Sequence, residues 1–310
     1  EPLGLPVGLL TGSVKEKDRK PLLAGLSDGS LPILIGTHAV LEPRVKFNNL
    51  GLAIIDEQHR FGVAQRAKLW KKNKRPPHIL VMTATPIPRT LAMSLYGDLD
   101  ISLIDELPPG RKPVRTVLRG DRDRLRVFGF LKDEIRKGRQ AYIVYPLIQE
   151  SEAMDYKDLM DGFESISREF PQPDFQVSIV HGQMKPEAKE YEMQRFAEGK
   201  TQIMVATTVI EVGVNVPNAS VMVIESAERF GLSQLHQLRG RVGRGADQSY
   251  CILMCGEKLS EEARTRLQTM ARTNDGFEIA ETDLKLRGPG NLLGTQQSGV
   301  LSLRIADLVR

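Results

Sequence analysis

Cysteine is scarce in this chain of 310 residues, which holds only Cys251 and Cys255. Two cysteines rule out a disulfide framework and cannot by themselves complete a four-ligand zinc site. They form either a metal or redox pair or, as we favour, two sulfur-bearing positions on one face of a buried strand. The low cysteine usage fits a reducing compartment, and we expect a cytoplasmic protein.

Long apolar runs and a strong charge bias are also absent. The sequence has no stretch of the ~18 apolar residues that a membrane helix needs, and no signal peptide. Lys and Arg number 43 against 39 Asp and Glu, and this net charge of +4 does not by itself indicate a nucleic-acid partner. Because the first residue is Glu1 rather than Met, we expect the chain to be a piece of a longer polypeptide.

The sequence does contain a regular alternation of short apolar runs with amphipathic, helix-like stretches. Most runs are continuously apolar, as in strands covered on both faces, so the pattern predicts a parallel, doubly wound α/β architecture. The expected strands are Leu31–Gly36, Leu50–Asp56, His78–Thr83, Ala141–Tyr145, Gln176–Val180, Gln202–Thr207, Val221–Glu225 and Tyr250–Met254. The expected helices include Asp121–Lys137, Lys185–Glu198 and Ser260–Arg272.

A break in this alternation falls at Leu107–Pro113, which contains three prolines and a glycine. Such a segment cannot continue a helix or a central strand, so we expect a linker there. We therefore expect a first lobe over residues 1–110, a second lobe over residues 111–256, and a mostly helical tail over residues 257–310.

Two carboxylates, Asp56 and Glu57, follow the apolar run that ends at Ile55 and form the most informative motif. The carboxyl edge of a parallel sheet is where such folds place their ligands. In nucleotide hydrolysis one carboxylate holds the metal ion, usually through water, and a second polarises the attacking water. Asp56 suits the first role and Glu57 the second. The alternative is a helix N-terminus whose acidic residues are stabilised by the helix dipole.

Three further segments favour the nucleotide interpretation. Thr83–Pro86 supplies hydroxyl groups after another apolar run, and Ala206–Pro217 does the same in the second lobe. Gln234–Gly245 spaces arginines around glycines, and the planar arginine side chain can bind phosphate oxygens with paired hydrogen bonds. A solvated basic loop is the alternative for this last segment.

In this order, the segments resemble the motor motifs of superfamily 2 helicases, which have two RecA-like lobes of the P-loop NTPase type. The resemblance implies that Asp56 lies in the Walker B motif and binds magnesium through water, and that Arg241 and Arg244 are arginine fingers. Asn215 stands where many relatives carry Asp, so the ribose contact loses a charge. Further nucleotide contacts are implied for His59, Thr83, Gly213, Asn215 and Gln237.

The end of the chain resembles the RecG family in particular. Gly276–Gly290 and Leu293–Gly299 are similar to a translocation motif that RecG shares with the transcription-repair coupling factor Mfd, and Gln58 favours RecG. The resemblance implies a helical hairpin and loop that move with nucleotide turnover and pull on duplex DNA. The DNA and translocation residues that it implies are Thr207, Thr208, Arg287, Gly288, Gly290 and Gln297.

The phosphate-binding loop of such an ATPase, Gly-x-x-x-x-Gly-Lys-Ser/Thr, does not occur in these 310 residues. Gly199–Thr201 is a decoy, because Gln194 occupies the place of the first glycine and a helix rather than a strand precedes it. The resemblance places the loop ahead of all the motifs found, so we expect the first lobe to be truncated.

Together these features imply an ATP- and magnesium-dependent DNA helicase of RecG type that remodels stalled forks and Holliday junctions in recombination and repair. Branched or duplex DNA is the expected partner, and a single-stranded-DNA-binding protein is a further candidate. We expect this chain alone to be inactive. The alternatives are an Mfd-like translocase, which would contact RNA polymerase, and a non-catalytic DNA-binding module, which would not turn over ATP.

Overall fold

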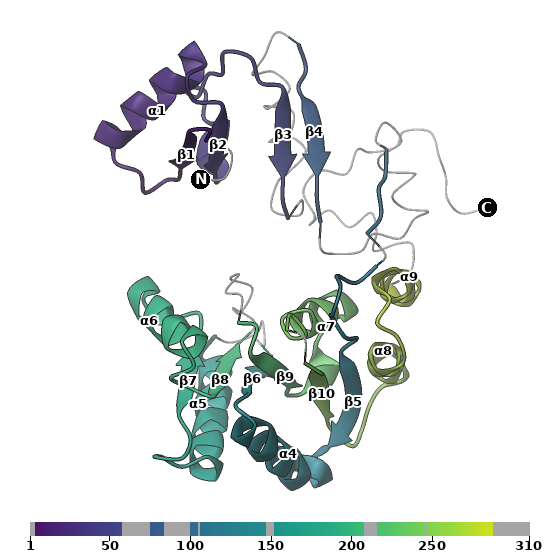
Figure 1. Ribbon diagram of the computed structural model, residues 1–310. Coiled ribbons are helices and arrows are strands. Elements are labelled where there is room, and N and C mark those ends of the chain that lie inside the picture. The colour runs from purple at the N-terminus through teal and green to yellow at the C-terminus, as the bar shows by residue number, and fades with distance from the viewer. Residues whose placement is uncertain are drawn as a thin grey trace, which may run out of the picture. The chain divides into compact units, whose positions relative to one another are not determined.

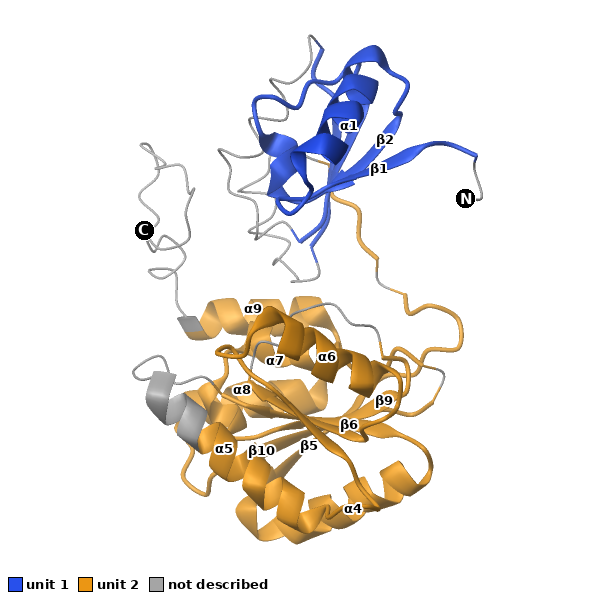
Figure 2. Ribbon diagram, turned by 90° about the vertical axis from the view of Figure 1, so that its left-hand side faces the viewer, with its two compact units in different colours: residues 1–84, 293–310 blue, residues 85–292 orange. Residues whose placement is uncertain are grey.

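The computed structural model describes residues 4–57, 75–83, 100–104, 106–146, 152–207, 216–245 and 247–287 (Figure 1). These residues form two compact units, which divide in the chain after residue 84 (Figure 2). Both units are built from parallel strands and helices, as the alternating pattern predicts. The lobe limits expected at residues 110 and 256 stay predictions.

One parallel ladder of the first unit joins β1 (Val7–Leu10) to β2 (Ile33–Gly36), with α1 (Glu16–Asp28) between them in the chain. The two strands approach closely at Gly36, where a Cβ atom would lie 2.3 Å from the carbonyl oxygen of Leu10, so only glycine fits. The apolar cluster of this part is formed by the buried residues Leu10, Leu26, Ala39 and Val45.

A second ladder of the first unit joins β3 (Leu52–Ile55) to β4 (His78–Val81). Ile54 and Leu80 are neighbours in this ladder and are 58% and 49% exposed, and Ile35 of β2 is 59% exposed. The expectation that the apolar strands are covered on both faces is therefore wrong for this unit. An apolar run shows that a face can be buried, but the covering element must come from elsewhere, and no described residue covers these faces.

The second unit is built on a six-stranded parallel sheet with the strand order β5-β10-β9-β6-β8-β7. Every residue of β8 and β9 is buried, which explains why these runs are continuously apolar. The strands are β5 (Arg115–Gly120), β6 (Gln140–Tyr145), β7 (Val177–Val180), β8 (Ile203–Thr207), β9 (Ala219–Ile224) and β10 (Tyr250–Cys255).

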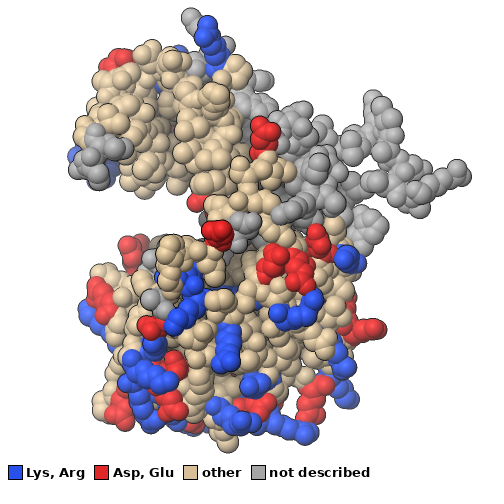
Figure 3. Space-filling model, turned by 45° about the vertical axis from the view of Figure 1, so that its right-hand side comes forward, with Lys and Arg blue, Asp and Glu red and all other residues tan. Residues whose placement is uncertain are grey.

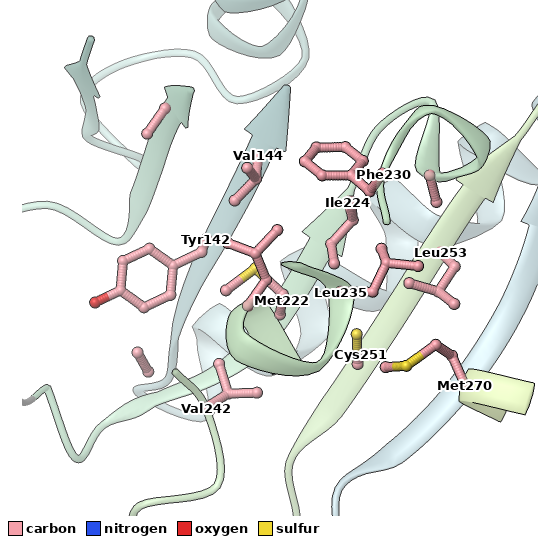
Figure 4. Packing of buried hydrophobic residues seen from close by; sticks show 14 of the residues in the cluster. Tyr142, Val144, Met222, Ile224, Phe230, Leu235, Val242, Cys251, Leu253 and Met270 are labelled. Carbon is pink, nitrogen blue, oxygen red and sulfur yellow. The ribbon is translucent and has the colours of Figure 1, made fainter. Parts of the chain in front are cut away.

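Helices cover both faces of this sheet. Alternate residues of β6 enter different cores: Tyr142 packs with the α6, α7 and α8 side, seen in Figure 4, and Ile143 packs with the α4 and α5 side. The helices are α4 (Arg124–Arg136), α5 (Glu152–Glu169), α6 (Pro186–Ala197), α7 (Leu232–Arg239), α8 (Glu261–Arg272) and α9 (Gly276–Arg287).

The eight expected strands are all confirmed, with ends that differ by at most two residues. β1 and β5 were not expected. Strand β10 confirms the structural interpretation of the cysteines, because Cys251 is buried and Cys255 lies on the same strand face with a partly exposed thiol. In the described part of the chain, no helix has the length and hydropathy to cross a membrane.

Candidate functional site

The carboxylates of Asp56 and Glu57 directly follow β3, and Thr83 follows β4 by two residues. The strands are parallel, and the amide of Met82 donates to the carbonyl oxygen of Ile55 at 2.8 Å, so both ends lie at the same edge. The structure therefore brings Asp56, Glu57 and Thr83 together, as expected from the sequence.

The chain turns sharply at Glu57, which has a positive φ of 51° although it is not glycine. This backbone conformation is uncommon for a residue with a side chain and costs energy. Asp56 stabilises the turn, because its Oδ1 accepts a hydrogen bond from the Glu57 amide at 2.8 Å. Asp56 is exposed at this edge of the ladder.

Oxygen ligands of this kind suit Mg²⁺, which keeps several waters and takes one or two protein carboxylates together with phosphate oxygens. The described residues contain no group of three or more His, Cys, Asp or Glu that could enclose a metal ion. Asp56 and Glu57 at the end of β3 therefore fit a magnesium ion that is shared with a nucleotide.

The residues 240–245 that follow α7 carry both predicted arginine fingers, and we call them the arginine loop. Arg244 is exposed and Arg241 is half-buried, whereas Val242 between them is fully buried and anchors the loop to the core (Figure 4). Gly243 has a positive φ of 78°, which favours glycine at this turn.

The two arginines act on one buried hydroxyl group, that of Tyr142 in β6. Burial raises the pKa of Tyr142 to about 12, and the positive charges of Arg244 and Arg241 oppose this rise. Both guanidinium groups therefore lie within electrostatic reach of the same side chain. The structure thus places Arg241 and Arg244 together on the second unit.

Thr207 ends β8 and lies opposite Tyr145 of β6, at the carboxyl edge of the six-stranded sheet. Its side chain is 2% exposed, and its Oγ1 has no hydrogen-bond partner among the described residues. Gln237 lies half-buried on α7, one turn before the arginine loop.

Arg287 is the last residue of α9, and its side chain lies outside the described part. Also outside the described residues are His59, Thr208, Gly213, Asn215, Gly288, Gly290 and Gln297.

A buried arginine, Arg239, was not foreseen from the sequence. Its guanidinium donates to the carbonyl oxygens of Met270 and Thr273 at 2.9 and 2.8 Å and to Nδ1 of His236 at 3.1 Å. It fastens α7 to the connection between α8 and α9. The spacing in the sequence could have indicated that Arg239 is buried, because it follows Leu235 by one helical turn and so lies on the apolar side of α7.

An ion pair between Arg124 and Glu225 was also missed. Two hydrogen bonds of 2.7 and 3.0 Å join the side chains, and Glu225 is 5% exposed. Burial, and then the charge of Glu225, raises the pKa of the neighbouring Tyr145. The pair stabilises the carboxyl edge of β9, because removing Arg124 would leave the charge of the buried Glu225 without this partner.

Charges of both signs are interspersed over the second unit on the face shown in Figure 3. Several arginines of the second unit have acidic partners, for example Arg122 with Glu257 at 2.7 Å and Arg136 with Asp133 at 3.0 Å. That face therefore carries no broad positive field. Recognition of an anionic partner would depend on particular side chains rather than on overall charge.

Comparison with known protein families agrees with this division into two units. Residues 1–94 match the DEAD/DEAH box helicase family, and residues 126–246 match the helicase conserved C-terminal domain. Residues 273–310 match the C-terminal part of domain 3 of the ATP-dependent DNA helicase RecG. The fold and the motif residues thus define the motor part of a two-lobed, superfamily 2 type helicase.

Whole-chain comparisons then identify the family. The chain is 54% identical to the ATP-dependent DNA helicase RecG of Synechocystis sp. over 99% of its length, and 51% identical to that of Escherichia coli K12 over its whole length. A RecG structure bound to a three-way DNA junction matches with a TM-score of 0.74 and 46% identity, covering 93% of this chain and 37% of that one. The chain belongs to the RecG family of helicases.

The chain spans less than half the length of these curated relatives, 37% of the Synechocystis protein and 45% of the E. coli protein. The match of residues 273–310 to a RecG domain favours RecG over the Mfd-like alternative and over a non-catalytic DNA-binding module.

Proposed function

We propose that the protein carrying this chain is an ATP-dependent DNA helicase or translocase that remodels branched DNA, such as stalled forks and Holliday junctions. One observation carries the proposal: over its whole length, the chain shares 51–54% sequence identity with helicases named RecG. The similar RecG structure that is bound to a three-way junction supports branched DNA as the substrate class.

In this proposal the residues after β3 and β4 act on ATP. Asp56 orients a magnesium ion through water, and Glu57 polarises the attacking water. The metal ion would neutralise charge on the phosphates when bound. The turn at Glu57 supports this role, because both carboxylate residues directly follow β3 at the carboxyl edge of the ladder. Thr83, at the same edge, would link the nucleotide state to movement on DNA.

The arginine loop would act on the same nucleotide. Arg241 and Arg244 are arginine fingers that stabilise negative charge as the terminal phosphate is transferred to water. Their place in one short loop, on either side of the buried Val242, supports a joint role. The remaining proposed nucleotide contacts are His59, Gly213, Asn215 and Gln237.

DNA would be bound mainly through backbone phosphates, which makes binding independent of sequence and sensitive to salt. Thr207 is a proposed contact because it ends β8 at the sheet edge and its buried Oγ1 has no hydrogen-bond partner among the described residues. The other proposed DNA and translocation residues are Thr208, Arg287, Gly288, Gly290 and Gln297. A cytoplasmic location is part of the proposal, and a single-stranded-DNA-binding protein is a candidate partner.

The proposal is tested by steady-state ATP hydrolysis with and without a branched DNA substrate. The protein should carry this chain together with a phosphate-binding loop. We expect turnover that requires magnesium, increases with branched DNA and is lost in Glu57→Gln. The matched control is Glu187→Gln on α6, in the second unit, which should keep the wild-type rate. Turnover that survives Glu57→Gln would refute the assignment of Glu57.

A further inference from the structure

The arginine loop is held by a segment that lies 132 residues earlier in the chain. Nε of Arg111 donates to the carbonyl oxygen of Gly243 at 2.6 Å, and the contact is partly buried. Gly243 lies between Arg241 and Arg244, so this bond fixes the backbone midway between the two proposed fingers. Arg111 belongs to the proline-rich segment that the sequence indicates only as a linker.

Packing around the loop supports the same contact. A Cβ atom on Gly243 would lie 2.8 Å from Cγ2 of Val114, so residues 111–114 lie directly against the loop. Gln248 also donates to the carbonyl oxygen of Pro113 at 2.9 Å. A Cβ atom on Gly245 would also lie 2.8 Å from the carbonyl oxygen of Pro217. The loop is therefore packed closely against both Val114 and Pro217.

We infer that Arg111 is a positioning residue for ATP hydrolysis, which holds the arginine loop so that Arg241 and Arg244 are presented in fixed positions. The inference deepens the proposed function and rests on it. Groups that stabilise a transition state are effective only when they are held in place before the reaction. A hydrogen bond from a charged guanidinium to a carbonyl oxygen is strong enough to hold a short loop. Arg111 itself touches neither nucleotide nor DNA in this account.

The test compares Arg111→Met with Arg111→Gln in a protein that carries this chain and a phosphate-binding loop. Methionine matches the length of the arginine stem but donates no hydrogen bond. Glutamine carries an N–H donor at the position of Nε but has no charge. We expect Arg111→Met to lower kcat by about 10- to 100-fold with little change in KM for ATP. Arg111→Gln should restore most of kcat.

Two controls make the result specific. Arg115→Met removes a nearby exposed arginine and should leave kcat unchanged, because only the backbone amide of Arg115 bonds to Ser249. Arg111→Met should also keep the wild-type affinity for a non-hydrolysable ATP analogue, because arginine fingers act on the transition state rather than on the bound nucleotide. A loss of affinity as large as the loss of kcat would overturn the inference. Failure of Arg111→Gln to restore kcat would also overturn it, because the charge rather than the hydrogen bond would then matter.

A readout that needs no ATP hydrolysis separates this inference from the proposed function. Trypsin cleaves after arginine in mobile backbone, so cleavage after Arg244 reports how firmly the loop is held. We expect faster cleavage there in Arg111→Met than in wild type, Arg111→Gln or Arg115→Met. Equal cleavage in all four proteins would overturn the inference. Absence of ATP turnover in the wild-type protein would instead overturn the proposed function, while the cleavage rates still decide the role of Arg111.

Discussion

Single charged residues at the ends of parallel strands and after α7 provide the proposed chemistry. Asp56 and Glu57 lie where β3 ends, and Arg241 and Arg244 lie in a loop that Val242 anchors. Each pair belongs to one compact unit, so the position of its side chains depends on local packing. Individual substitutions should therefore affect distinct steps of the reaction.

Arg244→Ala should abolish hydrolysis while sparing nucleotide binding, in a protein that carries this chain and a phosphate-binding loop. An arginine finger contributes about 10³–10⁵ in rate by stabilising charge in the transition state. The measurement is kcat alongside the affinity for a non-hydrolysable ATP analogue. Arg136→Ala, on the exposed side of α4, is the control and should behave as wild type. Lost affinity with unchanged turnover at saturation would show that Arg244 only binds the ground state.

His236 should make stability depend on pH. Burial, and then the charge of Arg239, lowers the pKa of His236 to about 4, against 6.5 for the free side chain. The folded protein keeps this histidine neutral, whereas the unfolded chain takes up a proton below pH 6.5. The contribution of His236 to the free energy of unfolding is therefore fully present above pH 6.5. The free energy of unfolding should fall by up to about 3 kcal/mol as the pH drops towards 4.

Denaturant unfolding between pH 7 and pH 4.5 tests this prediction. His236→Asn should flatten the pH dependence, because asparagine keeps an acceptor for Arg239 but does not titrate in this range. His181, whose pKa is also lowered by burial, provides the comparison, and His181→Asn should leave the greater part of the slope. An unchanged slope in His236→Asn would contradict the assignment.

The sequence predicted the site residues that follow apolar runs but not those that support them. Asp56 and Arg244 stand beside strong local signals, an apolar strand in one case and spaced glycines in the other. Arg111 and Arg239 bind carbonyl oxygens of residues that are distant in the chain. Such contacts depend on tertiary packing, and no spacing within one segment indicates the partner.

Elements were predicted best where both faces of a strand are buried. β8 and β9 are apolar throughout and stood out from the sequence. β5 was missed because it is an edge strand in which the exposed Arg115 and Arg119 alternate with less exposed residues. β1 was missed because it begins in a Gly- and Pro-rich stretch. Exposed charged residues and neighbouring Gly and Pro both weaken the apolar signal.

Helix α4 should stabilise the second unit through its buried side. Leu131 is fully buried against the sheet, so Leu131→Ala should lower the free energy of unfolding by about 2–5 kcal/mol. Leu125 on the same helix is 76% exposed, and Leu125→Ala should change the free energy of unfolding by no more than about 0.5 kcal/mol. Far-UV circular dichroism in denaturant measures both. Equal effects of the two substitutions would contradict the packing of α4.

On the scale of the whole molecule, the sequence contains motifs from two helicase lobes but no phosphate-binding loop. We predict that the 310-residue chain alone does not hydrolyse ATP at a measurable DNA-dependent rate. Without the backbone amides and lysine of that loop, Asp56 can attract magnesium, but no held phosphate meets the arginine fingers. DNA-stimulated turnover by the chain alone that disappears in Glu57→Gln would show that the phosphate site lies within these residues.

The central claim, that this chain is the motor of a RecG-type helicase, is tested most directly by unwinding of a labelled three-way DNA junction. The protein should carry this chain together with a phosphate-binding loop, and strand release should be followed with magnesium and ATP. We predict release with ATP, none with a non-hydrolysable analogue, and none in Arg244→Ala. ATP hydrolysis without any strand release, or release that does not require hydrolysis, would contradict the claim.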